Sequence, residues 1–221
     1  MSHLNILRTY ALSDPAKIPS AVLFSNKSTS LTIYDAFPKS IFHFLVLPRM
    51  AKEDTTSDLT SLKTVLMGDK AYAKKIISAL AGDAKILGDE IEGEMLKRYG
   101  FKWDIWTGFH AVPSMKHLHL HVLSTDLCSG RMKLKKHYNS FHPKLGFFLD
   151  IDAVLTWFDA EPSYFEGVSK LEAKAYEAIL KEDLVCWSCN TTMKNMPTLK
   201  AHLQGEWNRQ AKLGRKADKG S

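Results

Sequence analysis

Three histidines that recur at every second position constrain the fold of this chain more than any other feature. His117, His119 and His121 alternate with aliphatic residues inside the stretch 106–124. Successive side chains of a β-strand point to opposite faces, so a strand gathers the three imidazoles on one face and the aliphatic groups on the other. A helix would spread the same histidines over about 200° and divide the aliphatic groups. The pattern therefore predicts a half-buried strand with a face of imidazoles.

Three imidazoles in register suit two kinds of chemistry. One of them can be a nucleophile whose neighbours orient it and fix its tautomer, or the face can bind a metal ion. A solvated strand face that happens to be rich in histidine is the plainer alternative. A fourth histidine, His110, and the pair Pro113-Ser114 lie close by in the sequence, and this favours a functional site.

The motif resembles that of a known family of enzymes. Residues 117–123 match the signature His-φ-His-φ-His-φ-φ, with φ an apolar residue, of the histidine triad (HIT) nucleotide hydrolases and transferases. The longer match over residues 108–124 is similar to the aprataxin branch, whose members remove AMP from abortive DNA ligation ends. The resemblance implies a hydrolase that acts on double-stranded or nicked DNA with a 5′-adenylated end and releases AMP.

The catalytic roles follow from the spacing of the histidines. The central histidine of an i, i+2, i+4 set is held by both neighbours and by the strand backbone, so His119 is the predicted nucleophile, as the HIT resemblance also implies. His117 and His121 are expected to orient His119 and to contact the phosphate. His110 is expected to contact the departing group, as an acid or as a positive charge.

The resemblance implies that an earlier hairpin forms the adenosine pocket. Asp35 would bind the ribose hydroxyls, while Phe37 and Leu47 would sandwich the base. Lys39 and His43 would support the phosphate end. From the residues alone, this segment is only a pair of strands punctuated by proline, with a buried aromatic residue.

Three residues near the histidines complete the expected nucleotide site. Ser114 is placed to hydrogen-bond the phosphate, and Met115 belongs to the same site. Ser124 is expected to support either the strand or the nucleotide.

A second motif predicts a zinc site near the C-terminus. Cys186-Trp-Ser-Cys189 is followed by His202 after twelve intervening residues, which supplies three ligands of a Cys2His2-type finger. The next histidine is missing, and Glu206 lies one helical turn after His202. We therefore expect Cys186, Cys189, His202 and Glu206 to bind one structural Zn²⁺. Aprataxins carry a zinc finger after the HIT domain, usually with histidine in the fourth place, so Glu206 departs from the pattern.

The fold class follows from the order of the expected elements. Strand, strand, strand, helices, strand, strand gives an α+β fold, a HIT-like antiparallel sheet with flanking helices and a small C-terminal zinc-finger domain. We expect the helix that starts near residue 69 to break near Gly82 and Gly88. The expected parts are a HIT catalytic domain over 1–150 with an N-terminal helix in 1–13, a helical connector over 151–183, and a zinc finger with a basic tail over 184–221.

The charge of the chain suits a polyanionic partner. The net charge is +6, and residues 131–144 carry much of the excess. Contacts with the DNA backbone give affinity without sequence information. The candidates in this stretch are Lys133, Lys135, Lys136, Ser140 and Lys144. Tyr10 either stacks on an exposed terminal base pair or is buried in the core.

Two other functions remain open from the sequence. One is a general HIT hydrolase of adenosine phosphoramidates or dinucleoside polyphosphates, which would need neither the finger nor the basic stretch 131–144. The other is a non-catalytic nucleic-acid-binding module in which the three histidines bind a second metal ion.

The expected location is the nucleus, with the cytoplasm as a second location. No apolar run approaches the ~18 residues of a membrane span. Three cysteines, two of them in a C-x-x-C, favour a reducing compartment. We expect a monomer, because a fused finger can occupy the surface through which many simple HIT proteins dimerise.

Overall fold

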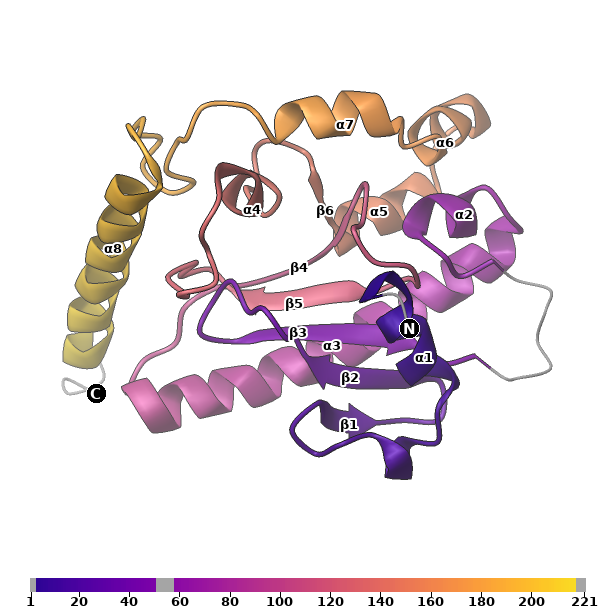
Figure 1. Ribbon diagram of the computed structural model, residues 1–221, viewed down its shortest axis with the longest axis horizontal. Coiled ribbons are helices and arrows are strands. Elements are labelled where there is room, and N and C mark those ends of the chain that lie inside the picture. The colour runs from indigo at the N-terminus through magenta and orange to yellow at the C-terminus, as the bar shows by residue number, and fades with distance from the viewer. Residues whose placement is uncertain (1–2, 51–57, 218–221) are drawn as a thin grey trace.

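A computed structural model describes residues 3–50 and 58–217 (Figure 1). The end of the predicted basic tail, after Ala217, lies outside the described residues. Of the helices in the described residues, none is long and apolar enough to cross a membrane.

Six strands form one sheet in which every neighbouring pair is antiparallel. In spatial order they are β1 (Leu23–Asn26), β2 (Ser30–Tyr34), β3 (His43–Pro48), β5 (Leu120–Ser124), β4 (Ile105–His110) and β6 (Phe148–Asp150). The predicted α+β class and the predicted hairpin are confirmed. The segment that includes Phe148 joins the sheet as its edge strand β6.

The histidine strand is shorter than the sequence predicts. The expected strand 117–124 begins at Leu120, because the two residues at its start bond elsewhere. His117 has a positive φ of 97°, and its amide donates to Thr60 O over 2.9 Å. The amide of Leu118 donates to Leu59 O. His117 therefore enters the site from a bend that is held by the segment before helix α2 (Leu62–Leu66).

Helix α3 (Lys70–Tyr99) runs unbroken for 30 residues along one face of the sheet (Figure 1). The predicted break near Gly82 and Gly88 is wrong. A buried stripe repeats at helical spacing over the whole length, from Ala73 through Leu80 to Met95. The free energy gained by burying this stripe exceeds the cost of about 1 kcal/mol that each glycine adds in a helix.

The remaining helices are short except for the last one. They are α1 (Ile6–Leu12), α2 (Leu62–Leu66), α4 (Lys135–Asn139), α5 (Ile151–Trp157), α6 (Pro162–Ser169), α7 (Ala173–Ile179) and α8 (Met196–Ala217). Two short 3-10 turns, His3–Asn5 and Pro15–Lys17, flank α1.

The two faces of the sheet carry different clusters, as the alternation of β3 shows. Phe44 and Val46 belong to the main core under α3. Leu45 and Leu47 belong to a smaller cluster with Leu7 of α1. On β5, Leu120 and Val122 join the main core, whereas Leu123 packs with the C-terminal finger. His121 therefore shares its face with Leu123, between the α1 cluster and the finger.

The finger is packed against the sheet domain. Leu199 and Leu203 of α8 are buried with Leu123 and Tyr138. Further along α8, the ring of Trp207 packs against Tyr99, Phe101 and Trp103. Arg215 Nε donates to Tyr99 O over 2.7 Å. Because hydrophobic clusters cross the expected boundaries, the division at residues 150 and 183 stays a prediction.

Candidate active site and zinc finger

The backbone fixes the tautomer of His119. Its Nδ1 lies 2.7 Å from His117 O, and since a carbonyl oxygen only accepts, Nδ1 carries the proton. The lone pair of the neutral imidazole is therefore on Nε2. The imidazole of His117 is fixed in a similar way, because its Nε2 donates to Pro48 O over 2.7 Å. A free Nε2 lone pair is what a nucleophilic histidine requires.

A second chain of hydrogen bonds sets the tautomer of His121. The amide of Lys39 donates to His43 Nδ1 over 3.1 Å, so the proton of neutral His43 is on Nε2. That proton points to His121 Nδ1 at 3.0 Å, which makes Nδ1 of His121 an acceptor. The proton of His121 is then on Nε2, and Nε2 is buried with no partner among the described residues. His121 thus has an unused donor within the buried group of imidazoles.

Burial keeps these imidazoles neutral at physiological pH. It lowers the pKa of His43 and of His117 to about 4. It also lowers the pKa of His119, and those of His110 and His121 fall well below the usual value. Neutral rings are good nucleophiles and hydrogen-bond donors, whereas an imidazolium has no lone pair for attack.

His110 belongs to the same buried group of imidazoles. Its ring centroid is 4.4 Å from that of His121 and 4.6 Å from that of Phe141. Nε2 of His110 is buried without a hydrogen-bond partner in the described part of the chain. The rings of His119 and His121 are 5.0 Å apart, so the predicted catalytic histidines form one group.

Asp35, His43 and His121 could also hold a metal ion on distance grounds alone, since their ligand atoms lie within 4.8 Å of one another. A metal ion between the two imidazoles would need a lone pair on His43 Nε2. The proton would then move to Nδ1 and face the amide hydrogen of Lys39. This conflict between two donors disfavours a metal ion at Asp35, His43 and His121. The alternative of a metal ion on His117, His119 and His121 stays a prediction.

The expected adenosine residues are only partly brought together. Asp35 Oδ1 accepts from the amide of Phe37 over 2.6 Å, and its Oδ2 lies 3.7 Å from His43 Nε2. Leu47 is fully buried in the α1 cluster, whereas the Phe37 side chain is 60% exposed. The expected sandwich of the base between Phe37 and Leu47 stays a prediction: Phe37 lies on the turn before Pro38, with the guanidinium of Arg131 over its ring.

Ser124 is buried and supports the strand. It shares hydrogen bonds with the carboxylate of Asp126 and with the amide of Phe42, so the geometry favours a structural role over a nucleotide contact. Asp126 also accepts from the amide of Ile41 and from Trp103 Nε1. Sequence reasoning missed Asp126, although it lies only two residues after Ser124, in the turn that follows β5.

The loop before the histidines forms a hollow of about 320 Å³ with the N-terminal segment and α2. Ser114 is exposed there, and the partly buried Met115 packs against the α1 cluster. Tyr10 is half-buried against the same cluster, so neither expectation for Tyr10 is excluded.

The expected DNA contacts divide into two groups. Lys133 and Lys136 are exposed, and their role stays a prediction. Lys135 Nζ donates to Lys181 O, and Lys144 Nζ donates to Asn190 Oδ1 over 2.6 Å, so both bind the C-terminal part of the chain. The hydroxyl of Ser140 is buried and donates to His137 O, which places it in support of α4.

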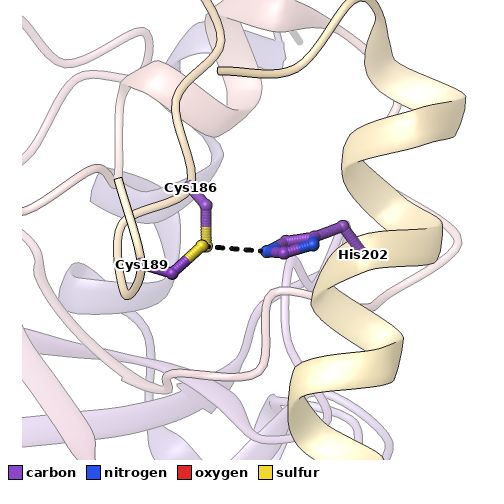
Figure 2. A group of neighbouring side chains, drawn as sticks. All are labelled: Cys186, Cys189 and His202. Atoms are coloured by element: carbon purple, nitrogen blue, oxygen red, sulfur yellow. Dashed lines mark hydrogen bonds between the residues drawn. The ribbon is translucent and has the colours of Figure 1, made fainter. Parts of the chain in front are cut away.

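Three of the four expected zinc ligands converge (Figure 2). The ligand atoms of Cys186, Cys189 and His202 lie within 4.8 Å of one another, and Cys189 Sγ is 3.3 Å from His202 Nε2. Hydrogen bonds with Thr191 lower the pKa of Cys189 to about 7, which favours the thiolate that zinc binds.

Glu206 as the fourth ligand stays a prediction. Its Oε1 lies 3.5 Å from His202 Nε2, and its Oε2 accepts from Arg209. This distance is compatible with two ligands on one tetrahedral ion, but Glu206 is not part of the group that the other three residues form, and it is these three whose donors fit zinc. Tyr138, which sequence reasoning missed, braces the turn that carries the cysteines: its hydroxyl donates to Val185 O and accepts from the amide of Trp187.

Comparisons with known proteins agree with both motifs. A family model described as "C2HE / C2H2 / C2HC zinc-binding finger" matches residues 144–209, and one described as "Scavenger mRNA decapping enzyme C-term binding" matches residues 11–137. The aprataxin-like protein of Saccharomyces cerevisiae is 30% identical over 233 residues, with 94% of this chain and 97% of the relative covered. The chain belongs to the aprataxin family.

Other members of the aprataxin family support the assignment. The aprataxin-like protein of Schizosaccharomyces pombe is 31% identical over 186 residues, with 79% of this chain and 70% of the relative covered. The crystal structure of the aprataxin ortholog Hnt3 in complex with DNA matches with a TM-score of 0.69 and 27% identity, over 97% of this chain and 100% of that one. The chain spans only 24% of the relative from Drosophila melanogaster and 39% of that from Ciona intestinalis.

Proposed function

We propose that this chain is a DNA-end repair hydrolase that removes AMP from 5′-adenylated DNA through a covalent histidine–AMP intermediate. One observation carries the proposal: the bond from His119 Nδ1 to His117 O leaves the Nε2 lone pair free in a buried group of imidazoles. Membership of the aprataxin family and the DNA in the related Hnt3 structure support DNA as the substrate.

In the first step, His119 Nε2 attacks the phosphorus of the AMP group. A new N–P bond forms, and the P–O bond of the anhydride breaks. The electron pair leaves with the 5′-phosphate of the DNA strand, which is a good leaving group and needs no strong acid. The imidazole becomes positively charged, and the carbonyl of His117 stabilises the proton on Nδ1.

In the second step, water attacks the same phosphorus. The N–P bond breaks, its electrons return to Nε2, and AMP leaves with the oxygen of the water. The electron pair that returns to Nε2 restores neutral His119, and the attacking water gives up a proton to solvent as its oxygen stays on AMP. The unused N–H of His121 is placed to donate to a phosphate oxygen in both steps.

The finger has a structural part in this proposal. Cys186, Cys189, His202 and Glu206 would hold one Zn²⁺, which staples a small domain that buries few apolar residues of its own. Lys133 and Lys136 would bind the DNA backbone beside the finger. We expect a monomer in the nucleus.

The test is the release of AMP from a nicked duplex with a 5′-adenylated end, compared with release from an adenosine phosphoramidate such as AMP-lysine. Wild type is expected to process the duplex far faster, and His119→Ala is expected to process neither. Turnover of the small substrate alone would instead indicate a general HIT hydrolase. If neither substrate reacts, the chain is a binding module.

A further inference from the structure

An exposed aromatic residue lies on a turn that is hydrogen-bonded, through His43, to the group of imidazoles. The ring of Phe37 is 60% exposed, although its backbone is held on both sides. The amide of Phe37 donates to Asp35 Oδ1, and its carbonyl accepts from Lys39 Nζ. Since Lys39 also binds His43 through its amide, the turn is continuous with the relay that ends at His121. Phe37 is thus pre-organised and not buried.

A guanidinium covers one face of this ring. The Cζ atom of Arg131 lies 5.5 Å from the centroid of Phe37, so the loop after β5 meets the turn before β3 at this point. Arg131 is close enough to Lys39 to contribute to its lowered pKa, for which burial is the main cause. In the described residues, neither Arg131 nor Lys39 has a carboxylate within 4.0 Å. Two cations that form no ion pair therefore flank an exposed ring, and Asp35 is the nearby carboxylate that partly offsets the charge of Lys39.

A ring with one free face and cations at its edge is a combination that proteins use for single-stranded nucleic acid. Bases stack on the aromatic face, and the cations bind the phosphates, with little dependence on sequence. A base inside a duplex is already stacked on both faces, so the ligand of such a ring is an unpaired base. The only base of an adenosine phosphoramidate is the adenine of the adenylate itself, so a second, unpaired base is offered by a DNA substrate alone. Simple burial of Phe37 is excluded by its exposure.

We propose that Phe37 and Arg131 form a stacking platform for one unpaired nucleobase of the DNA strand, outside the pocket that takes the adenylate. The inference rests on the proposed function, because it assumes a nucleic-acid substrate. The platform holds the nucleotide that follows the reacting phosphate, and it favours ends with an unpaired nucleotide over fully paired ends.

The test is a binding measurement on the full chain in a His119→Ala background, by fluorescence anisotropy. One probe is a duplex whose 5′-phosphorylated strand ends in one unpaired thymidine, and the second has an abasic residue at that position. We expect the thymidine probe to bind about tenfold more tightly, in the range of one stacked base. In Phe37→Leu this ratio is expected to fall to about one. Arg131→Lys, which keeps the charge and loses the planar group, is expected to reduce it.

Tyr164→Leu is the matched control, because Tyr164 is 54% exposed on α6. The control is expected to keep the tenfold ratio. A ratio of one in His119→Ala without a second substitution would overturn the platform. So would an unchanged ratio when Phe37→Leu is added. AMP release by wild type tests the proposed function separately, so loss of the ratio with intact AMP release rejects only the platform.

Discussion

At the scale of single residues, two backbone groups, one carbonyl and one amide, set the tautomers of the histidines and so their chemistry. His117 O holds the proton of His119 on Nδ1, and the amide of Lys39 sets the tautomers of His43 and His121 in turn. The motif predicts which imidazoles gather, because alternation and spacing are visible in the sequence. The tautomers are not visible there, because that of His119 depends on the bend at His117 and that of His121 depends on a bond to His43, 78 positions earlier in the chain.

Replacing His43 tests this relay. In His43→Phe the ring volume is kept, but His121 Nδ1 loses its donor. We expect kcat for AMP release to fall roughly 10- to 100-fold, as for other groups that orient a catalytic imidazole. The ¹⁵N shifts of the imidazoles should show His121 protonated on Nε2 in wild type and as a mixture of tautomers in the variant. An unchanged tautomer with unchanged kcat would refute the relay.

The buried imidazoles also predict how stability depends on pH. The pKa of His43 and of His117 is about 4 in the folded chain and 6.5 in the unfolded chain. Between these values the unfolded state binds more protons, so the free energy of unfolding decreases as the pH falls from about 6.5 towards 4. Above pH 6.5 these two groups add no pH dependence.

Denaturant unfolding at pH 7.5, 6.5 and 5.0 measures this effect. His43→Phe removes one of the two groups and should show a smaller loss between pH 6.5 and 5.0. A variant with the full wild-type loss would show that His43 is not the source.

At the scale of elements, tertiary contacts override the local sequence preferences of two segments: α3 continues through its glycines, and β5 starts later than its alternating pattern. The buried stripe of α3 was visible in the sequence, but its strength against two glycines was not, because that depends on the sheet beneath the helix. The start of β5 at Leu120 depends on Leu59 and Thr60, which take the amides of the two residues where the strand was expected to begin.

Glycine substitutions distinguish a helical glycine that faces open space from one that is in close contact with another side chain. A Cβ on Gly88 of α3 would meet nothing within 4 Å, so Gly88→Ala is expected to stabilise the chain by about 0.5–1 kcal/mol. A Cβ on Gly214 of α8 would lie 2.7 Å from the side chain of Phe101, so Gly214→Ala is expected to destabilise. Chemical denaturation measures both. Equal effects of the two substitutions would contradict the packing of α8 on Phe101.

At the scale of the whole molecule, the finger and the sheet domain share their hydrophobic clusters. Leu123 of β5 packs with Cys186 and Leu199, and Trp207 of α8 packs on Trp103. The sequence predicted both motifs and the fold class. It did not predict these contacts, nor the hydrogen bonds of Asp126 with Ile41 and Trp103, because they join segments that are far apart in the chain.

Zinc removal is therefore expected to affect the entire chain. In Cys186→Ser, or after chelation, we expect one cooperative transition with Tm lowered by at least ~4 °C, because 1 kcal/mol corresponds to roughly 2–4 °C at this size. Cys128→Ser is the control, since the Cys128 thiol lies outside the ligand group and should keep the response to chelation. Two separate transitions, with that of the sheet domain unchanged, would show that the finger is independent.

The covalent intermediate is the most direct test of the central claim, that His119 Nε2 is the nucleophile. The chain is mixed with 5′-adenylated nicked DNA, quenched within the first turnover, and digested under conditions that preserve phosphoramidates for mass spectrometry. We predict an AMP adduct on the peptide that contains His119, and no adduct in His119→Ala. Rapid AMP release without an adduct on His119, or with an adduct on another residue, would contradict the account.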